Sequence, residues 1–197
     1  SAIIAPRFLA SAFAAGPCLI VIMALILKRV ANFDAGRVAI DKIVTIIIYA
    51  AIANMFFWSL ELFVGAYSNV PGHLHTLKYL FFGLEHNGHV YNNLVPFMWL
   101  FLILFIVGIA MISYPPIRRG GGLWLGVGCA CIFTAFWLDK GIGFVLGGFV
   151  PTPTDEIVEY YPHFNELMIA AGIWAAGFFI LTILYKIAIG VDREIEA

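Results

Sequence analysis

Long apolar stretches separated by short polar segments dominate the chain, and five of them are long enough to cross a lipid bilayer. A membrane-spanning helix needs about 20 mostly apolar residues. The sequence meets this requirement over residues 6–27, 43–67, 94–113, 123–145 and 165–189. We therefore predict an all-α fold over residues 1–197, a single polytopic bundle of transmembrane helices with two longer loops at about 68–93 and 147–164.

The fourth apolar stretch has no sharp end. Asp139 and Lys140 close its main run, and the residues that follow, Gly141–Val150, are apolar but rich in glycine. Such a segment either extends the helix or dips back into the membrane as a short re-entrant segment, which is tolerated only where protein buries it. The sequence leaves both structures open.

Composition supports a membrane protein and excludes several functions. Hydrophobic residues make up 62% of the chain and charged residues 12%, whereas soluble domains carry about 25% charged residues. The net charge of -1 gives no electrostatic basis for binding nucleic acid. The three cysteines lie in apolar runs without the spacing of a c-type haem or iron–sulfur motif, so we expect neither group in this chain.

Basic residues are unevenly divided between the two sides of the predicted bundle. One side carries Lys28, Arg29, Arg37, Lys42, Arg118, Arg119, Lys186 and Arg193, and the other carries Arg7, Lys78 and Lys140. Lys and Arg concentrate in cytoplasmic loops. We therefore expect a multi-pass protein of the inner (cytoplasmic) membrane whose first residue lies outside and whose C-terminus is cytoplasmic. Both longer loops then face outside, where loops of this size are either a docking surface or site or a pair of passive connectors.

The second predicted span contains a polar stripe. Asn54, Trp58, Glu61 and Gly65 follow at steps of four, three and four residues, which places them on one face of a helix. That face should point into the bundle, because an ionisable group within a bilayer is costly to expose to lipid. Glu61 is then either a proton-relay or quinone-binding carboxylate, or a structural hydrogen-bonding group between helices.

Charged residues also occur near the ends of the fourth and fifth spans. Asp139 and Lys140 follow Trp137, which fits an interfacial ion pair with an aromatic anchor or the charged wall of a quinone pocket. Glu166 opens the fifth span three residues after His163. It is either a carboxylate stabilised by the helix dipole or half of a proton-exchanging pair with this histidine.

The histidines do not form a convincing metal motif. His73 and His75 are separated by one residue, and His86 and His89 by two, with no cysteine nearby; zinc sites usually show stronger spacing. No histidine lies in the core of a predicted span, where a haem b ligand would have to be. We expect no metal site in this chain.

Three motif blocks occur in an order typical of one membrane-protein family. They are Ala5-Pro6-Arg7-Phe8 with Ser11–Pro17, then Trp137–Gly141, then Gly148–Pro153 with Glu159–Pro162 and Glu166. Over nearly its whole length the chain resembles the C-terminal half of the NrfD/polysulfide-reductase membrane subunit family, in particular the larger HybB- and DsrP-like members.

This resemblance implies a function. Members of this branch have about ten spans and no haem, bind menaquinone or ubiquinone within the bundle, and exchange electrons with an iron–sulfur subunit on the outer side. Cytochrome or catalytic subunits often join them, as in sulfite-reductase-linked (DsrMKJOP-like) complexes. On this basis we expect five further spans upstream and a subunit that is not catalytic alone.

The expected site combines the resemblance with the polar residues described above. Glu61, Asp139, Glu166 and His163 are the candidate proton-exchanging residues, and Asn54, Trp58, Glu61, Trp137, Asp139 and Lys140 are the candidate quinone-binding residues. Two other functions use the same features: an ion or proton transporter or channel, and a passive membrane anchor. Copurified quinone and a copurified iron–sulfur subunit would favour electron transfer over transport, whereas a passive anchor predicts that Glu61 and Asp139 can be replaced without effect on electron flow.

Overall fold

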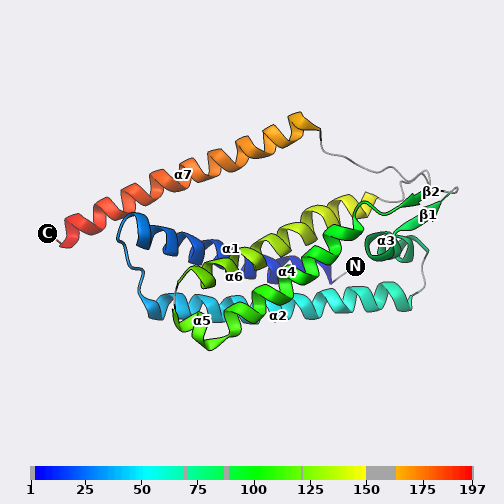
Figure 1. Cartoon of the computed structure of the whole chain (residues 1–197), viewed down its shortest axis with the longest axis horizontal. Coiled ribbons are helices and arrows are strands. Elements are labelled where there is room, and N and C mark those ends of the chain that lie inside the picture. The colour runs from blue at the N-terminus through cyan, green and yellow to red at the C-terminus, as the bar shows by residue number, and fades with distance from the viewer. Residues whose placement is uncertain (1–2, 69–70, 87–88, 121, 150–162, 197) are drawn as a thin grey trace. The chain divides into compact units, whose positions relative to one another are not determined.

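The structure is a computed structural model, and it describes residues 3–68, 71–86, 89–120, 122–149 and 163–196. Among these residues, five helical segments are long and apolar enough to cross a membrane, which confirms the predicted all-α transmembrane fold (Figure 1). They are α1 (Ile4–Val30), α2 (Arg37–Tyr67), α4 (Val95–Ser113), α6 (Leu123–Leu138) with its continuation, and α7 (Phe164–Glu196).

The second helix begins earlier than its apolar stretch. We predicted a start near residue 43, whereas α2 begins at Arg37. A helix of 31 residues is about 46 Å long, which exceeds the hydrocarbon core of about 30 Å. The additional turns carry Arg37, Asp41 and Lys42, so apolar patterning marks only the part of the helix that lies in lipid.

The chain divides into two compact units, Ser1–Glu159 and Tyr160–Ala197. Helix α7 is the described part of the second unit, and nearly all its side chains are exposed within the chain. In the first unit, α1 packs against α2 and α6, and α6 also packs against α4. The buried side of α1 consists of Arg7, Ser11, Ala14, Cys18 and Val21, a four-three spacing that keeps one helical stripe inward.

The segment between α2 and α4 is more ordered than the predicted loop at 68–93. It contains the short helix α3 (Pro71–Phe82) and an antiparallel hairpin of β1 (Leu84–His86) and β2 (His89–Tyr91). Gly83 lies between α3 and β1 with a φ of 81°, a left-handed conformation that glycine adopts without steric cost. The hairpin lies at one end of the unit and the short helix α5 (Pro115–Gly120) at the other (Figure 1).

The glycine-rich segment after α6 extends the helix. Asp139–Leu146 forms a π-helix, followed by a single 3₁₀ turn at Gly147–Phe149. Of the two structures left open by the sequence, the described residues adopt the first, a continued helix.

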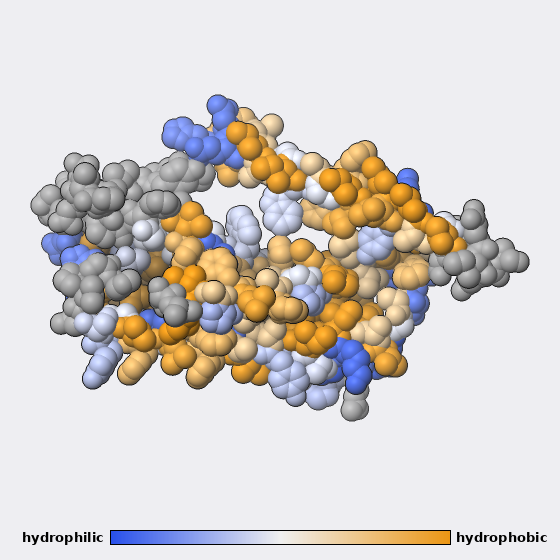
Figure 2. Space-filling view, turned by 180° about the vertical axis from the view of Figure 1, so that it is seen from behind, coloured by the Kyte–Doolittle hydropathy of each residue, from blue (hydrophilic) through white to orange (hydrophobic). Residues whose placement is uncertain are grey.

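Large apolar side chains also cover the outside of the helices. Ile46, Ile52 and Phe56 on α2 and Ile103 and Ile106 on α4 are each at least half exposed. Figure 2 shows hydrophobic residues spread along the helices on the face in view. Exposed apolar area of this extent is unusual for a soluble monomer, and it is the surface that a membrane-spanning protein presents to lipid.

Helices α4 and α6 approach closely at two glycines. A Cβ atom at Gly108 would lie 2.6 Å from Ile132 Cγ1 and 3.1 Å from the Gly128 carbonyl oxygen, and one at Gly128 would lie 2.8 Å from Ile112 Cγ2. Small residues at a crossing allow this proximity of backbones in a membrane, where van der Waals packing drives helix association.

We expect Gly108→Ala to destabilise the bundle by about 1–3 kcal/mol, the usual cost of overpacking a core. Gly16→Ala is the matched control, because a Cβ atom there would meet nothing within 4 Å and alanine is the better helix former. Thermal unfolding in detergent measures both variants. Equal midpoints would show that α4 and α6 do not cross at Gly108.

Candidate functional site

Four charged side chains from three helical segments meet at the hairpin end of the first unit. Arg7 of α1 donates one hydrogen bond through Nη1 to Glu61 Oε2 of α2 and another through Nη2 to Asp139 Oδ1, the second at 2.5 Å. Lys140 Nζ lies 3.1 Å from Asp139 Oδ2. These residues, which we call the charge cluster, balance two cations against two carboxylates.

The members of the charge cluster differ in their access to the outside. The exposed fraction of the side chain is 2% for Asp139 and 6% for Arg7, but 29% for Glu61. Asp139 is therefore sealed between helices, while Glu61 has an open side. Of the two carboxylates, Glu61 is the more accessible from outside the first unit.

Asp139 and Lys140 join the charge cluster at the start of a π-helix. Successive residues of an α-helix do not face each other, yet both side chains join the cluster where the α-helical hydrogen bonding of α6 ends. Segments of π-helix frequently occur at functional sites. Close packing accompanies the change, because a Cβ atom at Gly143 would lie 2.9 Å from Met98 Sδ.

Aromatic side chains complete the surroundings of Lys140. Its ammonium lies 4.3 Å from the centroid of the Phe8 ring, within the range of a cation–π interaction. Phe8 in turn meets Phe144 edge to face, with ring centroids 5.0 Å apart. The ammonium thus lies between one carboxylate and an apolar aromatic pair.

The polar stripe on α2 points inward as predicted. Asn54, Trp58 and Gly65 are buried, and Glu61 is partly buried. The Trp58 ring packs against Phe101 and Phe81, at centroid distances of 5.7 and 6.0 Å. The stripe therefore joins the charge cluster to the aromatic interior of the bundle.

Asn54 has no polar partner among the described residues. Its exposed fraction is 0%, and neither Nδ2 nor Oδ1 forms a hydrogen bond. Leaving buried polar atoms unsatisfied costs about 1–3 kcal/mol. An amide in this state fits a site that offers one donor and one acceptor to a polar ligand.

The charge cluster also has unused hydrogen-bonding capacity. Arg7 Nε has no hydrogen-bond partner among the described residues, and the Lys140–Asp139 contact is an ion pair without hydrogen-bond geometry. Arg7 Nε, Lys140 Nζ and Asn54 Nδ2 are thus buried donors without a hydrogen-bond acceptor among the described residues.

The structure does not bring Trp137 into the cluster. This side chain is 55% exposed although its neighbours Leu138 and Asp139 are buried, so it lies on the outer face of α6. That position fits the interfacial anchor that the sequence also allowed.

His163 and Glu166 lie together at the start of α7, in the other unit. The backbone N–H of His163 donates to Glu166 Oε2 at 3.0 Å. This is one of the two hydrogen bonds of a capping box, the one in which the side chain of a glutamate at the third helical position accepts from the backbone N–H of the N-cap residue. Both side chains are exposed within the described chain.

Arg7 is the member of the charge cluster that our sequence analysis missed as a site residue. We counted it among the basic residues of the outer side. However, it lies inside the predicted span 6–27 and is the only charged residue between its start and Leu27. The rule that ionisable groups within a bilayer are functional candidates would have identified it, and would also have supplied the counterion for Glu61 and Asp139.

Most side chains of the histidine pairs in the 68–93 segment lie outside the described residues. Among the residues that the structure describes, no three histidine, cysteine or acidic residues gather as metal ligands would. His75 is exposed. The side chains of His73, His86 and His89 lie outside the described set.

Comparison of the chain with protein-family models, with curated proteins and with solved structures gives no match.

Proposed function

We propose that this chain is a quinone-interacting subunit of a respiratory electron-transfer complex in the inner membrane. It exchanges electrons between the membrane quinone pool and an iron–sulfur partner on the outer side, as the resemblance to the NrfD/polysulfide-reductase family implies. The observation that carries the proposal is the charge cluster of Arg7, Glu61, Asp139 and Lys140. Its unused donors lie within membrane-spanning helices, and the unpartnered Asn54 lies on the same face of α2 as Glu61.

The orientation of the site fits this function. The cluster lies at the end of the bundle that carries few basic residues, which the positive-inside rule places outside. Proton exchange would occur there, on the same side as the partner. The N-terminal end of the chain is then outside and the C-terminus cytoplasmic.

Each residue of the site has a distinct role in the proposal. A bound menaquinone or ubiquinone would supply two-electron, two-proton redox chemistry. Glu61, which is partly exposed, accepts or delivers the protons that accompany it. Lys140 stabilises negative charge that develops on a ligand oxygen, and Arg7 fixes both carboxylates.

Asn54 and Trp58 serve binding rather than proton transfer. The Asn54 amide offers a donor and an acceptor deeper along α2, seven residues or about 10 Å from Glu61 by helical rise. Trp58, with Phe81 and Phe101, provides the apolar wall that small-molecule sites use with a few polar groups.

A proton or ion transporter is the second candidate, because it too would use buried carboxylates beside an interruption in a helix. Labelling with a photoreactive azidoquinone separates the two. The complex is purified in lipid nanodiscs, irradiated, digested and mapped by mass spectrometry. We expect labelled peptides from the stretches 54–65 and 137–146, with labelling abolished by excess unmodified quinone.

The same preparation gives the opposing result if the chain is a transporter. Proton flux into liposomes that contain no quinone, together with no labelling that excess quinone abolishes, would show that the chain is a transporter and not an electron-transfer subunit. If labelling and flux are both absent, the chain is a membrane anchor.

A further inference from the structure

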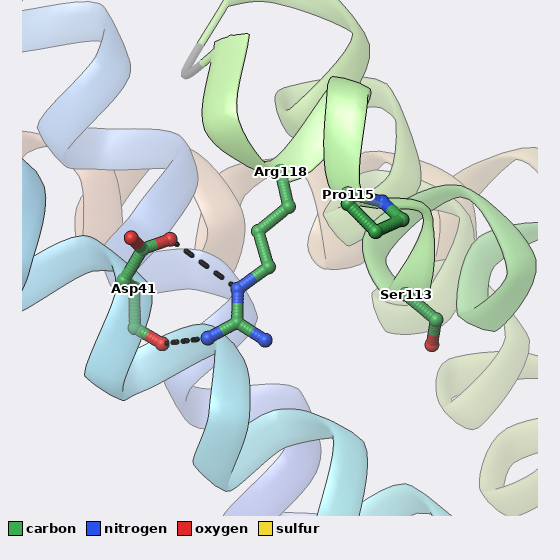
Figure 3. A pocket seen from close by; sticks show the side chains of 4 residues that line it. All are labelled: Asp41, Ser113, Pro115 and Arg118. Carbon is green, nitrogen blue, oxygen red and sulfur yellow. Dashed lines mark hydrogen bonds and ion pairs between the residues drawn. The ribbon is translucent and has the colours of Figure 1, made fainter.

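A second polar site lies at the opposite end of the bundle, beside α5. A pocket of about 290 Å³ is lined by Asp41 of α2, Ser113 at the end of α4, and Pro115 and Arg118 of α5. Figure 3 shows the Arg118 guanidinium between Asp41 on one side and Ser113 and Pro115 on the other. This site shares no residue with the charge cluster.

The Arg118 side chain is fixed by three bonds to α2. Its Nε donates to Asp41 Oδ1 at 3.3 Å, and its Nη2 donates to the Asp41 carbonyl oxygen at 2.9 Å and to Thr45 Oγ1 at 2.6 Å. Thr45 donates its own hydroxyl proton to the same carbonyl, at 2.8 Å. The guanidinium is therefore held in one orientation before any ligand arrives.

Several polar atoms at this pocket remain open. Within the described part of the chain, Arg118 Nη1, Asp41 Oδ2 and the Ser113 hydroxyl form no hydrogen bond or ion pair. The guanidinium nitrogen without a dashed line lies on the Ser113 side in Figure 3. The pocket thus offers a charged donor and a hydroxyl, with a carboxylate oxygen as acceptor.

The pocket lies at the depth of lipid headgroups. Ser113 is the last residue of the 19-residue apolar span α4. Asp41 lies in the second turn of α2, between Arg37 and Lys42 in the sequence and beyond the apolar part of that helix. The side chains of Arg118 and Asp41 are 29% and 35% exposed, so a headgroup can reach both.

We propose that this pocket binds the phosphoethanolamine headgroup of a membrane phospholipid. Arg118 Nη1 and the Ser113 hydroxyl hold the phosphate, since guanidinium groups recognise phosphate well. The Asp41 carboxylate accepts from the primary ammonium. The charges of the pocket favour this headgroup, because Asp41 and Arg118 carry one negative and one positive charge. A zwitterionic headgroup pairs its phosphate with Arg118 and its ammonium with Asp41. An anionic headgroup has no cation for Asp41 and would bring a second negative charge close to it.

Native mass spectrometry of the purified full-length protein in mild detergent tests this assignment. Phosphatidylethanolamine is titrated against phosphatidylglycerol and phosphatidylcholine with the same acyl chains. We expect phosphatidylethanolamine to bind about fivefold more tightly than either, the worth of one partly exposed ion pair. Phosphatidylglycerol lacks the ammonium, and phosphatidylcholine has no N–H to donate.

Variants assign the preference to the pocket. Asp41→Asn should remove the preference for phosphatidylethanolamine, and Ser113→Ala should weaken all three phospholipids. Lys42→Gln, a neighbouring exposed cation on α2, is the control and should leave the ratios unchanged. Asp41→Asn hardly changes the shape of the side chain, so the variant should fold. The readout is the ratio of the lipids bound to one preparation, which does not depend on the yield of folded protein.

Two results would overturn the assignment. Equal affinity for the three lipids in the native protein would show that no headgroup is recognised. Displacement of the lipid by soluble glycerophosphoethanolamine at an equal concentration would assign the pocket to a soluble phosphoethanolamine ester instead.

Discussion

Replacing Arg7 by methionine should destabilise the bundle by about 3–5 kcal/mol, the usual cost of removing one partner of a buried ion pair. Arg7 is the only described residue that bonds both Glu61 and Asp139. Without it, Asp139, whose side chain is 2% exposed, keeps only the ion pair with Lys140, and Glu61 loses its one ion pair among the described residues. Unfolding in a denaturing detergent series measures the change.

Two further variants show that charge, not side-chain volume, causes this loss. Arg7→Lys keeps the cation but loses the planar fork that bonds two carboxylates at once, so we expect an intermediate loss. Adding Glu61→Gln to Arg7→Met removes the carboxylate that has lost its cation, while Asp139 keeps its ion pair with Lys140, so this double variant should regain most of the stability.

The control is Arg29→Met. Arg29 is an exposed cation near the end of the same helix, where substitutions usually change stability by less than about 0.5 kcal/mol. A similar small effect of Arg7→Met would mean that the charge cluster contributes nothing to the fold.

The five spans were predictable because apolar length is a local property of the sequence. The inward face of α2 was also predictable, since the steps between Asn54, Trp58 and Glu61 fix their direction on a helix. The early start of α2 was not predictable. Backbone hydrogen bonds alone extend the helix beyond the lipid, and the polar residues of that part give no apolar pattern in the sequence.

Contacts between helices were the part that the sequence could not supply. Asp139 and Glu61 were each identified as costly charges, but their common partner, Arg7, is 54 residues from Glu61 and 132 from Asp139. The pairing of Arg118 with Asp41 spans 77 residues. Hydropathy gives the depth of such residues in the membrane but not which helices are neighbours, and the π-helix at Asp139 has no known composition signal.

The largest functional effect should come from Glu61→Gln. If Glu61 exchanges protons with a quinone site, removal of the acid lowers quinone-linked turnover of the reconstituted complex by about 10²–10⁴-fold, the usual contribution of general acid–base catalysis. The glutamine still accepts a hydrogen bond from Arg7, so the fold should be retained. The measurement is electron transfer between a short-chain quinol or quinone and the iron–sulfur partner.

Asp139→Asn should behave differently from Glu61→Gln, because Asp139 is sealed and serves to position Arg7 and Lys140. We expect a smaller loss of turnover and a larger loss of stability. The two variants thus separate proton exchange from positioning, and a dependence of turnover on pH that changes only in Glu61→Gln would identify the exchanging group.

Glu85→Gln and Glu166→Gln are the matched substitutions outside the charge cluster. Glu85 is exposed on β1, and Glu166 accepts a backbone hydrogen bond at the start of α7, a capping role that glutamine also performs. Both variants should retain turnover. If Glu166→Gln abolishes turnover while Glu61→Gln leaves it intact, the proton-exchanging site belongs to the start of α7, and the charge cluster only holds α1, α2 and the π-helix together.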